Sequence, residues 1–135
     1  AVPIVGVIVG FEVDYTNLNI GGSNYRAAST RRTVFVADAT DLIFAGPQDG
    51  VGGVVAAASV GLNVAIALGS AGTSGAYASG LTVDSSTVAT TATLPLQVMG
   101  VTVSPDNDVT STSRPAEILV RVNTHAFGWA GLAGV

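Results

Sequence analysis

The stretch IVGVIVGFEVD, residues 4–14, indicates the fold class of this chain because its side chains alternate with a period of two residues. One face of the stretch carries only apolar side chains, namely Val5, Val7, Val9, Phe11 and Val13. Glu12 and Asp14 lie on the opposite face, which we expect to meet water. Such alternation is typical of a half-buried β-strand. We therefore expect a strand over residues 4–14 with one face in the core.

The rest of the chain favours the same kind of structure. Val, Thr and Ile supply 41 of the 135 residues, and these β-branched types suit a pleated surface. No segment keeps the i, i+3, i+4, i+7 spacing of an amphipathic helix. Alternation returns in the second half of 51–68, and further strands are expected at 33–37, 42–45, 81–84, 94–104 and 117–126. The sequence predicts an all-β fold in one domain, 1–135: an antiparallel, jelly-roll-like β-sandwich.

The segment 94–104 contains an irregularity that a strand would show. Its apolar residues keep one phase up to Val98 and take the opposite phase from Val101, on either side of Gly100. A one-residue phase slip of this kind predicts a β-bulge. Because Pro95 has no N–H to donate, we expect this strand to start at a sheet edge.

The segment 117–126 has the clearest division between two faces. Its inward-facing residues are expected to be Ile118, Val120 and Val122. Its outward-facing residues are expected to be Glu117, Arg121, Asn123 and His125.

The composition of this chain, above all its low content of charged residues, argues against several functions. Only 10% of the residues are charged, against about 25% in typical soluble domains. Five arginines, no lysine and nine carboxylates give a net charge of −4, which disfavours nucleic-acid binding. There is no cysteine, so disulfides and thiol chemistry are excluded. The uncharged segment 51–69 is long enough to cross a bilayer, but four glycines and Asn63 argue against a membrane helix.

No motif in the sequence points to catalysis. His125 is the only histidine, no G-x-S-x-G elbow is present, and without lysine no P-loop is possible. The residues between Asp106 and Glu117 partly match a calcium loop, but Ser111 stands where the glycine belongs and Arg114 where a ligand belongs. A surface turn explains this segment better. We expect no enzyme activity, and no catalytic, cofactor or metal site.

Two groups of residues are candidates for a partner interface. Interfaces are poor in Lys and Glu and rich in Arg and aromatics, and this chain has no Lys and two Glu. Arg26, Arg31 and Arg32 form its only basic cluster, which is either a solvated face or a docking point for an acidic partner.

The second group lies in a glycine-rich, apolar C-terminal arm at about 127–135 and in the strand before it. Its members are Arg121, Phe127, Trp129, Leu132 and Val135. We expect the arm to dock on a neighbouring molecule. The alternative is that the arm folds back and covers its own sandwich.

Several runs of the sequence resemble a known family of virion proteins. These runs are GVIVGFEVDYTNL (6–18), YRAASTRRTVFVAD (25–38), VGLNV (60–64), LTVDSSTVATTATLPLQVMGV (81–101), PDND (105–108), ILVRVNTH (118–125) and AGLAGV (130–135). They are similar to tailed-bacteriophage head decoration, or cement, proteins, of the jelly-roll kind found in a Bordetella podovirus. The resemblance covers most of the chain, in order, and its motifs are structural.

The resemblance implies a β-sandwich on the outer surface of the phage head. Such a protein clamps neighbouring major capsid subunits and is usually a small symmetric oligomer, a dimer or trimer. We therefore expect the major capsid protein and other copies of this chain as partners, and neither nucleic acid nor membrane. The alternative is a free-standing β-sandwich binding module, for example for carbohydrate or host-surface adhesion. Such modules usually present a planar row of aromatics, and this chain has eight aromatics in all.

Overall fold

The computed structural model describes residues 3–13, 29, 31–69, 79–102, 105, 107, 116–128 and 131–135. The strands in these segments are β1 (Val7–Phe11), β2 (Val34–Ala37), β3 (Ile43–Gly46), β4 (Asn63–Leu68), β5 (Leu81–Ala89), β6 (Leu96–Val101) and β7 (Ile118–Val122). A short 3₁₀ turn, η1 (Ala57–Ser59), precedes β4. All pairs of these strands are antiparallel, which confirms the all-β prediction.

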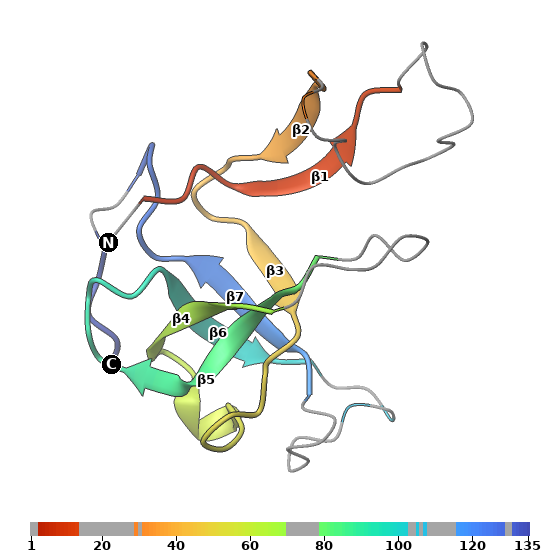
Figure 1. Ribbon diagram of the computed structural model, residues 1–135. Helices are drawn as coiled ribbons and strands as arrows, with labels where there is room; N and C mark the ends of the chain where they lie inside the picture. Colours follow the sequence, from red (N-terminus) through yellow and green to blue (C-terminus); the bar gives the residue numbers. More distant parts are fainter. Residues whose placement is uncertain are drawn as a thin grey trace.

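The strands form two sheets, in an arrangement consistent with a β-sandwich (Figure 1). The larger sheet has five strands in the order β3-β7-β6-β4-β5, and the smaller has β1 and β2. Strand β6 is therefore central, and the expectation that it starts at a sheet edge is wrong. Pro95 precedes the first paired residue, Leu96, so its missing N–H breaks no ladder bond. Its carbonyl accepts the N–H of Asn123 at 2.8 Å.

The predicted bulge is present in β6. The register between β6 and β7 shifts between Val98 and Gly100. Val98 lies opposite Val120 before the shift, and Val101 lies opposite Ile118 after it. The bulge thus keeps apolar side chains paired across the two strands although the sequence changes phase.

The core fills one face of the five-stranded sheet. It consists of Val55, Val64, Val83, Leu96, Val98, Ile118, Val120 and Val122. Buried Gln48 joins three segments around it: its amide donates to the carbonyls of Ala116 and Val55, at 2.9 and 3.3 Å, and its Oε1 accepts the Val55 N–H at 2.6 Å. The Ser85 hydroxyl also donates to Gln48 Oε1, at 3.1 Å, so the buried amide is satisfied.

The chain beyond β3 covers the outer edge of β5. Gln48 forms a parallel bridge with Val83. The Asp49 N–H donates to the Val83 carbonyl at 3.0 Å, and the Val83 N–H donates to the Pro47 carbonyl at 2.8 Å. The five-stranded sheet therefore curls until its first and last strands are linked.

The C-terminal residues 131–135 lie against the chain's own sheet. This agrees with the alternative that the arm folds back onto its own sandwich. The N–H groups of Leu132, Gly134 and Val135 donate to Asn123 Oδ1, the Thr90 carbonyl and the Gly61 carbonyl, at 2.9, 3.0 and 3.2 Å.

Two side chains expected on the outer face of the last strand are instead buried. Asn123 is 3% exposed and His125 is 4% exposed. The alternation that placed them outside ends with β7 at Val122. The next residues turn away from the sheet, so the C-terminal segment covers Asn123, and residues 3–5 and 126–128 lie beside His125.

Candidate interaction surface

Strands β1 and β2 form a separate two-stranded unit, which we call the ribbon (Val7–Phe11 and Val34–Ala37). It projects from the five-stranded sheet at the top of Figure 1. Ile4 anchors it, because the Ile4 N–H donates to the Thr124 carbonyl at 2.8 Å and the Ile4 carbonyl accepts the Ala126 N–H at 2.9 Å. After this anchor the chain leaves the larger sheet.

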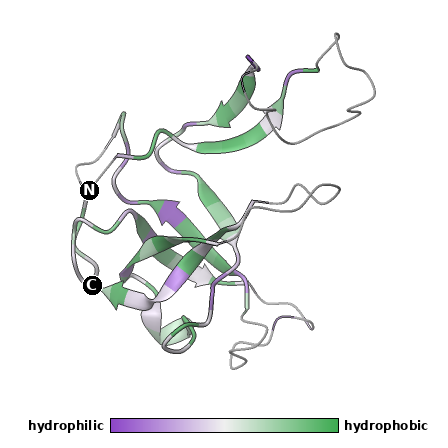
Figure 2. Ribbon diagram, in the orientation of Figure 1, coloured by the Kyte–Doolittle hydropathy of each residue, from purple (hydrophilic) through white to green (hydrophobic). Residues whose placement is uncertain are grey.

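The ribbon exposes apolar side chains on both of its faces. The exposed ones are Val7, Ile8, Val9, Val34, Phe35 and Val36, with Val5 and Val13 beside them. Ile8 and Phe35 are each 55% exposed. In Figure 2 both strands of the ribbon are coloured almost entirely as hydrophobic. A two-stranded hairpin is marginally stable by itself in water, so this surface is suited to a partner.

The expectation that one face of residues 4–14 is buried in the core is therefore wrong. The core cluster consists of side chains of β4 to β7 and of Val55, and Ile4, on the other face of the segment, packs against it. A Cβ at Gly6 would overlap the Ala37 carbonyl oxygen, so only glycine lets the chain before β1 pass so close to the end of β2.

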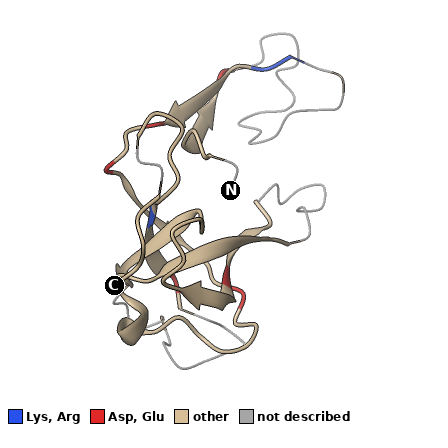
Figure 3. Cartoon of the chain, turned by 90° about the vertical axis from the view of Figure 1, so that its left-hand side faces the viewer, with Lys and Arg blue, Asp and Glu red and all other residues tan. Residues whose placement is uncertain are grey.

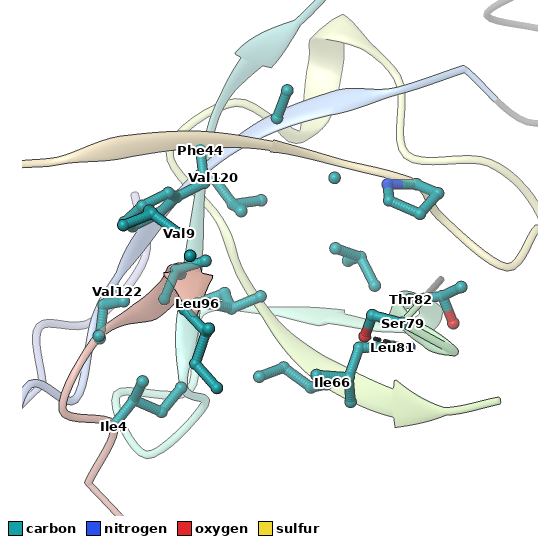
Figure 4. Close-up of a pocket in the computed structure, with 18 of the residues that line it drawn as sticks. Ile4, Val9, Phe44, Ile66, Ser79, Leu81, Thr82, Leu96, Val120 and Val122 are labelled. Atoms are coloured by element: carbon teal, nitrogen blue, oxygen red, sulfur yellow. Dashed lines mark hydrogen bonds between the residues drawn. The ribbon is translucent and has the colours of Figure 1, made fainter. Parts of the chain in front are cut away.

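A groove of about 980 Å³ lies between the ribbon and the larger sheet. Ribbon residues such as Val9 line one side, and Phe44, Leu96 and Val120 line the other. Figure 4 shows these side chains pointing into the open space, with Ser79 and Thr82 at one end. None of the residues that line it is charged. The groove therefore suits apolar groups, such as side chains of a bound protein.

The basic pair Arg31-Arg32 lies at one end of the ribbon, just before β2. Arg32 is half-buried, and its Nε and Nη2 donate to the Glu12 carbonyl at 3.3 and 3.2 Å. Its guanidinium carbon lies 4.9 Å from the centre of the Phe11 ring, a cation–π arrangement. Arg26 lies outside the described residues. The strands of the ribbon are otherwise uncharged along their length (Figure 3).

The second group of candidates lies in β7 and in the residues after it. Phe127, Leu132 and Val135 are exposed, while Trp129 lies outside the described residues. Arg121 donates from Nη2 to Gln97 Oε1 at 2.7 Å on the outer face of the sheet. The structure thus places Arg31 and Arg32 at the ribbon, Arg121 on the outer face of β7, and Phe127, Leu132 and Val135 in the segments after β7.

Sequence reasoning did not single out Ile8 and Phe35, two large apolar side chains that the ribbon exposes. A signal for them exists in the run IVGVIV, where Ile4 and Ile8 make the second face apolar as well. A strand that is apolar on both faces needs cover on both. The period-two pattern alone does not say which molecule provides that cover.

His125, the one histidine of the chain, is buried. His125 Nδ1 accepts the Phe127 N–H at 3.1 Å, and its Nε2 is buried without a hydrogen-bond partner in the described part of the chain. No group of three or more His, Cys, Asp or Glu residues that could hold a metal occurs within the described segments. Asp106 and Asp108 of the calcium-loop pattern lie outside them. The structure, as far as it is described, contains no helix long and apolar enough to cross a membrane.

The comparisons with known proteins do not assign the chain to a family. No protein-family model matches it, and searches of curated proteins and of solved structures found no similar protein.

Proposed function

We propose that this chain is a structural virion protein that decorates the outside of an icosahedral phage head. It acts as a cement protein: it binds across neighbouring major capsid subunits and stabilises the contacts between them. One observation carries the proposal, namely the ribbon that is apolar and exposed on both faces. The sequence resemblance to cement proteins indicates the kind of partner, and the exposed apolar ribbon is the physical reason to expect one.

The surface properties of the ribbon agree with a protein partner in an assembly. Exposed apolar patches of this kind mark interaction sites, and burying them is the main favourable contribution to association. The charges next to the ribbon strands are few: Glu12, Arg31, Arg32 and Asp38. Such rim charges orient a partner and add modestly to affinity. Binding would therefore depend more on shape and apolar contact than on salt.

The mechanism of stabilisation is mass action. A protein that binds only the assembled shell shifts the equilibrium toward that shell by its binding free energy. The proposed partners are the major capsid protein and further copies of this chain, in a dimer or trimer. The proposed location is the outer surface of the head, after synthesis in the cytoplasm of the host bacterium. This role requires no catalysis and no cofactor.

The proposal is tested by adding the purified chain to phage heads from which the decoration has been removed. We expect it to rebind in saturable amounts and to raise the temperature at which heads rupture or release DNA. The double variant Ile8→Ser/Phe35→Ser should bind at least about tenfold more weakly, since it removes two exposed anchors from opposite strands.

The matched control is Leu68→Ser, which changes an apolar side chain that is also exposed but lies at the end of β4, outside the ribbon. Its occupancy on heads should equal that of the unmodified chain. Equal rupture temperatures with and without the protein would refute the cement role. Equal binding of the ribbon variant would refute the ribbon as the attachment surface.

The second candidate function, a free-standing carbohydrate-binding or adhesion module, has less support. Among the described residues the exposed aromatic side chains are Phe35 and Phe127, which lie on the ribbon and near the C-terminus. Two described side chains on different segments do not make the planar row of aromatics on which sugar rings stack. Binding of the isolated chain to polysaccharides or host cells, without binding to heads, would favour this function over the first.

A further inference from the structure

Residues 131–135, which we call the segment, are held at the outer face of the larger sheet by two buried side-chain amides. The Leu132 N–H donates to Asn123 Oδ1 at 2.9 Å, and the Leu132 carbonyl accepts from Asn123 Nδ2 at 3.1 Å. The same carbonyl accepts from Asn63 Nδ2 at 2.6 Å. Asn63 and Asn123 are 0% and 3% exposed. Because the Asn123 amide exchanges two hydrogen bonds with one residue, it binds Leu132 as a neighbouring strand would.

The rest of the segment is also held through its backbone. The Gly134 N–H donates to the Thr90 carbonyl at 3.0 Å, and the Val135 N–H donates to the Gly61 carbonyl at 3.2 Å. The described hydrogen bonds of the segment lead to residues beside β4, β5 and β7, and none of them leads to residues 126–128, which precede the segment in the chain. The binding site is therefore complete without the covalent link to the segment.

The site has no room for a side chain at two positions of its ligand. A Cβ at Gly131 would overlap the Ala92 carbonyl oxygen. A Cβ at Gly134 would lie 2.9 Å from Leu62 Cα and 3.0 Å from the Asn63 nitrogen, so the backbone of the site would have to shift. The site thus selects a peptide with glycines three residues apart. Because the segment has this spacing, the ligand that fits is the segment itself, from this chain or from another copy of it.

The segment can leave its site without disturbing the core. None of its residues belongs to the core cluster, and the side chains of Leu132 and Val135 are 48% and 93% exposed. Gly131, at its start, has a φ of +96°, a conformation open to glycine, and such residues absorb the backbone rotations of a hinge. Elements held by few apolar contacts open locally at a lower free energy than the whole fold.

We propose that this site takes residues 131–135 of a second copy, so that neighbouring copies are joined by exchange of the segment. A segment from either source makes the same hydrogen bonds, so exchange loses no contact. An emptied site leaves the buried amides of Asn63 and Asn123 short of partners, which favours refilling. In the dilute chain its own segment fills the site. Where copies are crowded, the segments of neighbours reach a comparable local concentration.

This inference deepens the proposed function, on which it rests for the crowding of copies. It names the segment and the site through which copies are linked. The experiments below use the chain in solution without any capsid, whereas rebinding to heads tests the cement role. The two failures are therefore distinguishable.

The first experiment tests whether the site accepts a segment that is not attached to it. In the full chain, Gly134→Val should expel the segment and leave the site open. A capped peptide of residues 130–135, AGLAGV, should then bind in saturable amounts and raise the unfolding temperature. The same peptide with Gly134→Val should bind at least about tenfold more weakly. Ala133→Val, at an exposed position, is the matched control: that chain should keep its own segment and bind no peptide.

The second experiment tests exchange and uses the absence of cysteine from the chain. Val135 Cγ2 lies 3.1 Å from the place that a Cβ at Gly61 would take, so cysteines at these two positions are within reach of a disulfide. Gly61→Cys and Val135→Cys, one on each chain, are mixed at about 1 mM, the scale of local concentration that a short linker gives. In a thiol–disulfide buffer we expect a covalent heterodimer on a non-reducing gel.

Two controls accompany the mixture. Gly61→Cys mixed with Leu68→Cys measures chance collisions, because Leu68 is 86% exposed and lies at the far end of β4. That mixture should give at least about tenfold less heterodimer. The double variant Gly61→Cys/Val135→Cys, kept dilute, should close its disulfide within one chain. Its closure shows that the site tolerates both substitutions.

Three results would overturn the inference. A peptide that does not bind the folded Gly134→Val chain would mean that the site does not accept a separate segment. A double variant that fails to close would place the segment away from Gly61. A double variant that closes, while the single variants give no more heterodimer than the Leu68→Cys mixture, would confine the segment to its own chain. If circular dichroism shows that Gly134→Val unfolds the chain, the cysteine variants decide the question.

Discussion

The ribbon and the five-stranded sheet are built from similar strands but are covered differently. Strand β2 reads VFVA and strand β3 reads IFAG, and both are uncharged. The side chains of β3 to β7 meet a core that the chain itself provides, whereas those of β1 and β2 point largely into solvent. The comparison shows that apolar alternation predicts a strand without predicting what covers it.

The two regions also differ at their edges and outer faces. The segment after β3 covers the edge of β5, and residues 131–135 cover part of the outer face of the larger sheet. The ribbon has an open edge at β2 and two exposed faces within the described structure. The larger sheet is covered by its own chain, whereas the cover of the ribbon is the part that we propose a partner supplies.

The largest expected effect comes from the same substitution made in each region. Ile118 is fully buried in the core, while Ile8 is 55% exposed on the ribbon. Ile118→Ala should lower the free energy of unfolding by about 2–4 kcal/mol, since it removes buried methyl groups and leaves a cavity. Ile8→Ala should cost less than about 1 kcal/mol in the isolated chain.

Denaturant unfolding of the two variants measures this difference. Similar losses of stability would contradict the comparison, because they would mean that the ribbon packs against the body in solution. The complementary measurement is binding to heads, which Ile8→Ala should weaken and which Ile118→Ala should leave unchanged while the chain stays folded.

The sequence predicted local features better than long-range ones. Most strands and the bulge beside Gly100 were predictable, because they depend on neighbouring residues in one strand. The strand expected at 81–84 continues to Ala89 as β5, since Ser and Thr also fit a half-exposed edge strand.

Long-range features escaped because distant segments decide them. The burial of Asn123 depends on the return of residues 131–135, and that of His125 on residues near Ile4. The central position of β6 depends on strand order, which a single strand does not encode. The exposure of the ribbon beside Arg31 and Arg32 was likewise visible only once β1 and β2 had been placed in space.

A loss of stability of intermediate size is expected when residues 131–135 no longer pack on the outer face of the larger sheet. The Asn123 side-chain amide donates to the carbonyls of Ala92, Leu94 and Leu132, at 3.1, 3.0 and 3.1 Å, and its Oδ1 accepts the Leu132 N–H at 2.9 Å. Asn123→Ala leaves these buried groups without partners and should cost about 2 kcal/mol of stability. Thermal unfolding measures this loss.

Thr90→Ala is the control for Asn123→Ala. Thr90 is exposed and bonds to Gly134 through its backbone carbonyl, which the substitution keeps. That variant should unfold within about 0.5 kcal/mol of the unmodified chain. Deleting residues 131–135 should destabilise the isolated chain as Asn123→Ala does. If the truncated chain kept its full stability, the arm would instead be an interface element.

The smallest expected effect on stability concerns the edge of β5, which the segment after β3 covers. Asp49 lies where the chain after β3 meets β5, and its Oδ1 accepts the N–H groups of Ser85 and Val51 at 3.0 and 3.1 Å. Burial raises the pKa of the Asp49 carboxyl, but these hydrogen bonds outweigh burial and hold the pKa below its ordinary value. The ionised carboxylate therefore stabilises the covered edge.

A lowered pKa in the folded state fixes the sign of the pH dependence. The unfolded chain binds more protons at this group, so its stabilisation is complete above the unfolded value of about 3.9 and is lost as pH falls through the folded value. Asp49→Asn should cost about 1 kcal/mol at pH 7, and the difference from the unmodified chain should shrink below about pH 4. Exposed Asp41→Asn serves as the control. A difference that stays constant from neutral to strongly acidic pH would mean that packing at this edge, and not the charge of Asp49, holds the sheet closed.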